Sequence, residues 1–247
     1  MAQTPPEYMT FKEENFLTPP VEMFERNHNL IPDIDIEDYE LELMANGRGD
    51  ENPITLSFED LKKMPSHEVM AAIVCAGSRR RPLQEHHPTV KGAKWTNGAV
   101  GNGTYKGVPL RHILLNVMGL DEAKLRNKDL HVIFMGYDAD FQGTNYEVSI
   151  PIENALDPSN EVIAAYSMNG EEIPTMHGYP VRIVCPGYIG VRSCKWVNKI
   201  IVNKEMADST PQRRDYKVVT DRDISKVDWT AWKCVYGQVI NSAFTSP

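Results

Sequence analysis

Residues 68–81 have the sequence EVMAAIVCAGSRRR, an apolar run that ends in a cysteine and leads into three arginines. The run Glu68 to Cys75 is typical of a β-strand, and Ala76-Gly77-Ser78 predicts a turn directly after it. A strand end with cationic neighbours favours the thiolate of Cys75, the form that attacks electrophiles or binds metals. A buried structural cysteine is an equally weighted alternative. The three guanidinium groups also suit a tetrahedral oxyanion.

The rest of the chain contains more strands than helices. Ser57, with Asp60 three residues later, predicts a capped helix over 58–64. Apolar spacing predicts a second helix over 108–120, and the glycines of 101–107 lack the spacing of a dinucleotide loop. The irregular alternation of strands and helices predicts an α+β fold with mixed β-sheets and short helices. Further strands are expected at residues 39–45, 54–57, 130–135, 146–150, 162–166, 180–185, 195–203 and 238–244.

Composition narrows the function classes. The 247 residues carry a formal net charge of −8, and nucleic-acid binders normally have a basic excess. The apolar runs are too short to span a bilayer, so neither a nucleic acid nor a membrane is an expected partner. Four cysteines without C-x-x-C spacing argue against a disulfide framework or a zinc ribbon. No targeting signal is evident, so the cytoplasm is the default compartment, with mitochondria and peroxisomes left open.

A second segment, residues 177–196, combines glycines with basic side chains. Its glycines permit close approach to a bulky ligand, and His177, Arg182, Arg192 and Lys195 offer donors to a phosphate. Two strands with solvated basic residues are the plainer interpretation. Arg26-Asn27-His28 forms a weaker polar cluster of the kind found in turns. A cysteine hydrolase, with Cys75 as nucleophile and His28 or His177 as base, is also conceivable, although no spacing favours it.

Taken together, residues 24–217 resemble the molybdenum-cofactor domain of the sulfite oxidase family. Cys75-Ala-Gly-Ser-Arg-Arg80 is similar to that family's Cys-Ala-Gly-Asn-Arg-Arg, with Ser78 in place of asparagine. The resemblance implies that Cys75 is the single protein ligand of the molybdenum of a molybdenum–molybdopterin cofactor. It further implies cofactor contacts from Arg26, Asn27, His28, Asp138, His177, Arg182, Ser193, Cys194 and Lys195.

The same resemblance implies a pocket for a small anion formed by Arg26, Arg80, Trp95 and Tyr216. The family includes sulfite oxidases and the molybdenum domain of nitrate reductases. Residues 212–217, which contain Tyr216, are similar to the sulfite oxidase segment and favour oxidation of sulfite to sulfate. Nitrate reduction, and a non-catalytic cofactor-binding fragment, are the alternatives.

Domain organisation follows from the same comparison of motifs. Residues 1–20 are expected to form a flexible leader, 21–235 the catalytic domain, and 236–247 the first strand of a truncated immunoglobulin-like dimerisation domain. Members of the family form homodimers through that domain. The sequence contains no haem-binding His-Pro-Gly-Gly element. No haem is therefore expected in this chain, and electrons would pass to oxygen or to a separate acceptor.

Overall fold

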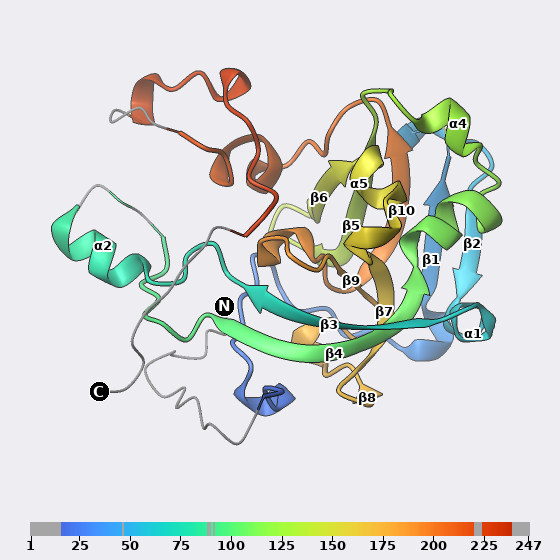
Figure 1. The fold of residues 1–247 in the computed structure, drawn as a ribbon, viewed down its shortest axis with the longest axis horizontal. Helices are drawn as coiled ribbons and strands as arrows, with labels where there is room; N and C mark the ends of the chain where they lie inside the picture. The colour runs from blue at the N-terminus through green and yellow to red at the C-terminus, as the bar shows by residue number, and fades with distance from the viewer. Residues whose placement is uncertain (1–15, 46, 88–89, 91, 220–223, 239–247) are drawn as a thin grey trace.

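The computed structural model describes residues 16–45, 47–87, 90, 92–219 and 224–238. Their strands form two sheets, and the antiparallel pair of β3 (His67–Val74) and β4 (Val100–Pro109) crosses beneath the first sheet in Figure 1. The main apolar core takes residues from both sheets, among them Leu41, Phe134, Ala164 and Ile183. This arrangement confirms the predicted α+β fold with mixed sheets.

The first sheet has the strand order β2-β1-β10-β5-β6. Its members are β1 (Glu40–Met44), β2 (Ile54–Ser57), β5 (His131–Ala139), β6 (Asn145–Pro151) and β10 (Val197–Asn203). β1 pairs with β10 in parallel, whereas the other pairs are antiparallel, so the sheet is mixed. β10 leads directly out of the segment predicted to bind phosphate, and the sheet therefore holds one end of that segment in place.

The second sheet runs β3-β4-β7-β8, and β9 pairs with β7. Its other members are β7 (Ile163–Met168), β8 (Glu171–Glu172) and β9 (Arg182–Val184). β3 alternates as a half-buried strand, with Val69, Ala71 and Ile73 inside. The glycine-rich strand β4 was not predicted. At Gly107, where its register with β7 shifts, an added Cβ would lie 2.0 Å from the carbonyl oxygen of Ala164. Glycine permits this close approach of two backbones.

The helices are short. α1 (Phe58–Lys63) has the predicted capping box between Ser57 and Asp60. The prediction of a helix over 108–120 is wrong at its start, because Val108 belongs to β4 and pairs with Ala164 of β7. Helical structure begins at α3 (Leu110–His112) and continues as a π-turn over Ile113–Val117. The remaining helices are α2 (Arg80–His86), which projects from the body in Figure 1 and was not predicted, α4 (Glu122–Leu125) and α5 (Ile152–Leu156).

The two ends of the chain are described in part. In the predicted leader, Thr18 donates its backbone N–H to the carbonyl oxygen of Asn102 on β4 at 2.7 Å. At the other end, Gly237 forms an isolated bridge with Tyr188, and the strand expected at 238–244 lies almost wholly outside the described residues. Across the part of the chain that the structure describes, no helix has the length and apolar character needed to cross a membrane.

Candidate functional site

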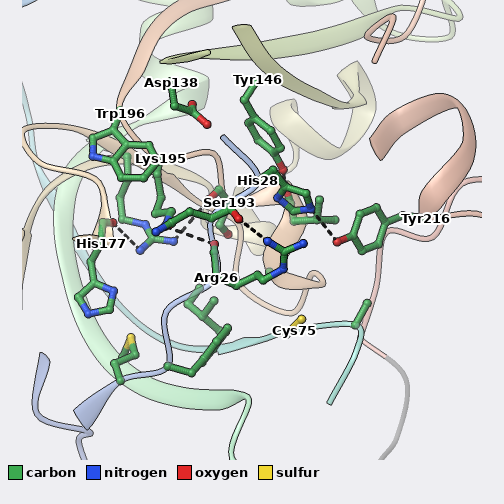
Figure 2. Close-up of a pocket in the computed structure, with 18 residues that line it drawn as sticks. Arg26, His28, Cys75, Asp138, Tyr146, His177, Ser193, Lys195, Trp196 and Tyr216 are labelled. Atoms are coloured by element: carbon green, nitrogen blue, oxygen red, sulfur yellow. Dashed lines mark hydrogen bonds between the residues drawn. The ribbon is translucent and has the colours of Figure 1, made fainter. Parts of the chain in front are cut away.

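A cavity of about 710 Å³, its mouth included, opens where the end of β3 meets residues 23–28 and the segment between β9 and β10 (Figure 2). Most of the sequence-predicted site residues line it, although they come from distant parts of the chain. They are Arg26, Asn27, His28, Cys75, Asp138, His177, Arg182, Ser193, Lys195 and Tyr216.

Cys75 reaches the cavity from the end of β3. Its backbone is fixed on both sides, because its N–H donates to Ala99 and its carbonyl oxygen accepts from Ser78, each at 2.9 Å. The N–H of Gly77 points at the sulfur, with 3.4 Å between nitrogen and Sγ. The turn after β3 therefore presents a half-buried sulfur suited to metal ligation.

The wall formed by the segment between β9 and β10 is cationic. The Arg182 guanidinium is buried and donates to the carbonyl oxygen of His177 at 2.8 Å. The Lys195 ammonium donates to the carbonyl oxygen of Met176 at 3.0 Å and to the side chain of Asn27. Within the described residues, neither cation forms an ion pair with a carboxylate. Buried cations held by neutral groups leave the cavity attractive to an anion.

Burial shifts the proton affinities of this wall. It lowers the pKa of Lys195 to about 7, helped by the neighbouring Arg182, while Asp138 opposes the shift. Burial raises the pKa of Asp138 to about 7 against the pull of Lys195. The pKa of His177 falls to about 4, mainly through burial. Its Nε2 lies 2.9 Å from the carbonyl oxygen of Pro20, which can only accept, so His177 is neutral with its proton on Nε2.

Several buried polar atoms in the cavity wall have no hydrogen-bond partner among the described residues. They are Nδ2 of Asn27, Oδ1 of Asp138 and Nε of Arg182. Leaving such an atom unsatisfied costs about 1–3 kcal/mol, so a cluster of them indicates a ligand with both donors and acceptors. A pterin offers ring donors and acceptors, and its phosphate would suit the cations. The residues present therefore fit a molybdopterin cofactor.

At the opposite side of the site, the ring of His28 stacks on Tyr146 with 5.4 Å between centroids, and its Nε2 lies 3.2 Å from the Tyr216 hydroxyl (Figure 2). Burial lowers the pKa of His28 to about 4, assisted by Arg26 and Lys195. Burial raises the pKa of Tyr216 to about 12, and a negative charge on Cys75 would add to that shift. Both groups are neutral near pH 7.

Four residues predicted to belong to the site do not line the cavity. Arg192, expected to offer a donor to a phosphate, is one of them, because its guanidinium donates instead to the carbonyl oxygen of Val235 at 2.8 Å. Cys194 is buried behind the wall, whereas its neighbours Ser193 and Lys195 line the cavity. Trp95 packs edge-on against Phe24, which does line the cavity, with 6.1 Å between centroids. Arg80 starts α2 and donates to the carbonyl oxygen of Ala93 at 3.2 Å. Its charge lowers the pKa of Tyr216, so it acts electrostatically on the site from outside the lining.

The structure also adds residues that the sequence did not single out. Tyr146 on β6 supports His28, and no local pattern marked it, because its partner lies 118 positions earlier. Trp196 has a positive φ of 50°, which is unusual for a bulky residue. The other additions are Met23, Phe24, Ile73, Ala76, Gly190 and Val191.

Comparison with known proteins agrees with this geometry. The family described as "Oxidoreductase molybdopterin binding domain" matches residues 28–211. The mitochondrial sulfite oxidases of Rattus norvegicus and Homo sapiens are 38% and 36% identical over all 247 residues. The chain spans only 43% and 44% of their lengths. The nitrate reductase [NADH] of Lotus japonicus is 33% identical over 243 residues, which cover 94% of this chain and 26% of that protein.

A solved structure shares the fold. The sulfane dehydrogenase SoxCD from Paracoccus pantotrophus superposes with a TM-score of 0.66 at 27% identity, covering 87% of this chain and 54% of that one. The expected resemblance is therefore confirmed at the level of family, fold and cofactor class. By the residues it matches and by its fold, the chain belongs to the family of oxidoreductase molybdopterin-binding domains.

Proposed function

We propose that this domain oxidises sulfite to sulfate on a molybdenum–molybdopterin cofactor held in the cavity. The observation that carries the proposal is the placement of one thiol, Cys75, across a cavity from cations and unsatisfied polar atoms. Sequence similarity also supports the proposal. The rat and human sulfite oxidases are 38% and 36% identical to the chain, whereas the nitrate reductase of Lotus japonicus is 33% identical.

The cofactor would be held by residues of the cationic wall. Arg182 and Lys195 would neutralise its phosphate, and Asn27 and Asp138 would pair with its polar ring atoms. Ser193 and His177 add short polar side chains beside them. Cys75 would ligate the metal, because a thiolate is a strong donor to a high-valent centre. Bound there, the cofactor supplies the oxygen atom transferred to sulfite and takes up the two electrons released.

The substrate would meet a second group of residues. The net reaction converts sulfite and water into sulfate, two protons and two electrons, so the site must attract a dianion into a chain of net charge −8. Arg26 lines the cavity, and Arg80 lies just outside it. Their charges raise the local concentration of anions. Trp95 would act indirectly, by supporting Phe24 in the wall.

Tyr216 would orient the substrate through a hydrogen bond. If the ring Nε2–H of His28 donates to the Tyr216 oxygen, the hydroxyl proton is left for an oxygen of the anion. Since His28 is neutral near pH 7, this arrangement needs no buried imidazolium. Electrons would then pass to oxygen or to a separate acceptor protein.

The experiment that tests the proposal is reconstitution of the purified domain with cofactor. Molybdenum content is measured together with sulfite-dependent reduction of an artificial acceptor and, separately, nitrate-dependent oxidation of a reduced donor. Sulfite turnover supports the proposal. Nitrate turnover alone supports a nitrate-reductase-type domain, and bound molybdenum without either activity supports a non-catalytic cofactor-binding fragment.

Compartment and assembly are part of the same proposal. The rat and human relatives are named mitochondrial, so a mitochondrial location joins the cytoplasm as a candidate for this chain. Homodimerisation through a domain beginning near residue 236 stays a prediction from the family. Cell fractionation and sedimentation of the whole protein test these two points.

A further inference from the structure

Arg192 is a fully buried arginine that the proposed chemistry does not use. It ends the 3₁₀ turn Gly190–Arg192, and its neighbours Val191 and Ser193 both line the cavity. None of the ion pairs among the described residues joins it to a carboxylate. Burying a guanidinium away from water is costly unless hydrogen bonds compensate for the lost hydration. The groups that it contacts therefore indicate what it holds.

All of these contacts belong to one region, which we call the strap and define as residues 211–218 and 233–237. Nε and Nη2 of Arg192 both donate to the carbonyl oxygen of Val235, at 3.1 and 2.8 Å. Nη1 donates to Oε1 of Gln212, and the guanidinium lies 5.0 Å from the ring centroid of Tyr236. One side chain thus joins both segments of the strap to the back of the cavity wall.

The strap carries Tyr216. Its first segment begins with a π-helical turn over Pro211–Asp215, and Tyr216 follows directly. The carbonyl oxygen of Tyr216 accepts from the N–H of Val235 at 2.8 Å. With the bond from the N–H of Val218 to the carbonyl oxygen of Lys233 at 3.0 Å, it forms an isolated antiparallel bridge between Lys217 and Cys234. Val235 therefore contacts Arg192 through its oxygen and Tyr216 through its nitrogen.

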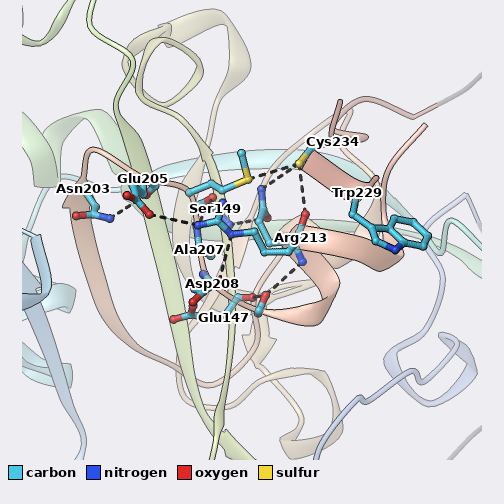
Figure 3. Close-up of polar contacts among 12 residues, drawn as sticks. Glu147, Ser149, Asn203, Glu205, Ala207, Asp208, Arg213, Trp229 and Cys234 are labelled. Atoms are coloured by element: carbon cyan, nitrogen blue, oxygen red, sulfur yellow. Dashed lines mark hydrogen bonds and ion pairs between the residues drawn. The ribbon is translucent and has the colours of Figure 1, made fainter. Parts of the chain in front are cut away.

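Gln212 supplies the second connection. It is fully buried, and its Oε1 accepts from the N–H of Ser149 on β6 at 3.1 Å as well as from Arg192. Figure 3 shows Ser149 and, to its right, Cys234 of the second segment of the strap. The next residue, Arg213, points the other way and pairs with the surface carboxylates of Asp208 at 3.2 Å and Glu205 at 3.4 Å. Two adjacent side chains of one turn thus face the interior and the solvent.

We propose that Arg192 is a positioning residue that holds the Tyr216 hydroxyl against His28 by fixing Val235 and Gln212 of the strap. The inference rests on the role proposed for Tyr216 in sulfite oxidation. The second segment also has a backbone tie to the body, from the N–H of Ile189 to the carbonyl oxygen of Tyr236 at 2.8 Å. Arg192 is distinguished because its one side chain bonds to both segments, at Val235 and at Gln212, and so fixes the two relative to each other. A displacement of about 1 Å at a reacting group lowers rates by roughly a hundredfold.

The first experiment uses the chain without cofactor and follows a 3-fluorotyrosine at position 216 by ¹⁹F NMR. The native chain and the Arg213→Gln control are expected to give one narrow, displaced resonance. Arg192→Met should broaden it or move it toward that of free fluorotyrosine. Arg192→Lys should give an intermediate spectrum, because one ammonium cannot span Val235 and Gln212 as a planar guanidinium does. If Arg192→Met does not fold, the spectrum of Arg192→Lys alone tests the proposal. An unchanged resonance in a folded Arg192 variant overturns the proposal.

The second experiment is a double-mutant cycle on the molybdenum-loaded protein. Arg192→Lys should lower kcat about ten- to a hundredfold in the native background and have almost no further effect when Tyr216 is already phenylalanine. Equal losses in both backgrounds mean a merely structural role and contradict the proposal. If the native domain turns over no sulfite, the proposed function fails, whereas the fluorine spectra still decide whether Arg192 positions Tyr216.

Discussion

The Tyr216 hydroxyl lies 3.2 Å from Nε2 of His28, although 188 positions separate the two residues in the chain. Tyr146 stacks on the same imidazole, with 5.4 Å between ring centroids. Burial lowers the pKa of His28 to about 4 and raises that of Tyr216 to about 12. The pair therefore keeps one protonation state between these two values.

Replacing Tyr216 with phenylalanine tests this state. One hydrogen bond to a charged substrate contributes about 1.5–3 kcal/mol, so Tyr216→Phe should lower sulfite turnover about ten- to a hundredfold and leave molybdenum content unchanged. Since neither His28 nor Tyr216 titrates between pH 5.5 and 9, the ratio of native to variant turnover should be the same across that pH range. Measurement of kcat and KM across that range checks it. A loss that varies steeply with pH would contradict the neutral pair.

Removal of the Cys75 thiol should abolish turnover, because an alcohol is a far weaker metal ligand than a thiolate. In Cys75→Ser, a fraction of the protein should still bind pterin, since Arg182 and Lys195 line the cavity and would still bind its phosphate. Molybdenum analysis and pterin fluorescence measure the two components separately. Cys185→Ala, which removes a buried thiol outside the cavity lining, is the matched control. Full activity in Cys75→Ser would sink the site assignment.

The charge of Arg80 can be moved by mutating a neighbouring residue instead of Arg80 itself. Its guanidinium lies over Gly77, where an added Cβ would come within 2.6 Å of Nη1. Because this is the far end of a flexible side chain, Gly77→Ala should fold and move the charge. Its KM for sulfite should rise in the same direction as that of Arg80→Gln, for which about ten- to a hundredfold is expected. Gly49→Ala, where an added Cβ meets nothing within 4 Å, is the control. An unchanged KM in both test variants would show that Arg80 does not contribute to substrate binding.

Retention of the cofactor should weaken as pH rises through 7. The pKa of Lys195 is lowered to about 7 and that of Asp138 is raised to about 7. Above this pH the lysine loses its positive charge and the aspartate gains a negative one, and both changes oppose an anionic ligand. The fraction of pterin retained after desalting between pH 6 and 8.5 measures the effect. Lys195→Arg, which stays charged, should flatten the profile, and a flat profile in the native chain would rule out this pair.

Acid should destabilise the cofactor-free fold through His177. Burial lowers its pKa to about 4 in the folded chain, from about 6.5 for an ordinary histidine. The unfolded chain therefore binds the proton first as pH falls from 6.5 toward 4. This one group contributes a loss of about 1.4 kcal/mol per pH unit in that window. His28 adds a similar loss, and Asp138, with a raised pKa, opposes it. Urea unfolding at pH 7, 6 and 5 should show a shallower pH dependence in His177→Gln than in the exposed-site control His86→Gln. Equal slopes would contradict a buried neutral His177.

The elements that depend on near neighbours could be predicted from the sequence. The capping box of Ser57 and Asp60 joins residues three apart, and the alternation of Val69, Ala71 and Ile73 shows directly which face of β3 is buried. The motif around Cys75 is also local, because the turn that exposes the sulfur follows it at once. For these features, backbone geometry and side-chain period are enough.

Other features could not be predicted because long-range packing decides them. β4 is a strand despite its glycines, since the close approach of Ala164 on β7 requires a residue without a side chain at Gly107. Arg80 and Cys194 belong to the predicted motifs but lie outside the cavity lining, because Arg80 bonds to the carbonyl oxygen of Ala93 and Cys194 is buried in the core.

The sequence by itself determined the fold class and the residue types of the site, since motifs of contiguous residues carry both. Only the tertiary structure brought Tyr216 to His28 and placed Arg192 beneath the strap. It also buried Lys195 and Asp138 together, and burial sets their pKa values. Desolvation and contacts between residues from 43 to 188 positions apart exist only after the chain has folded, so no local pattern could contain them.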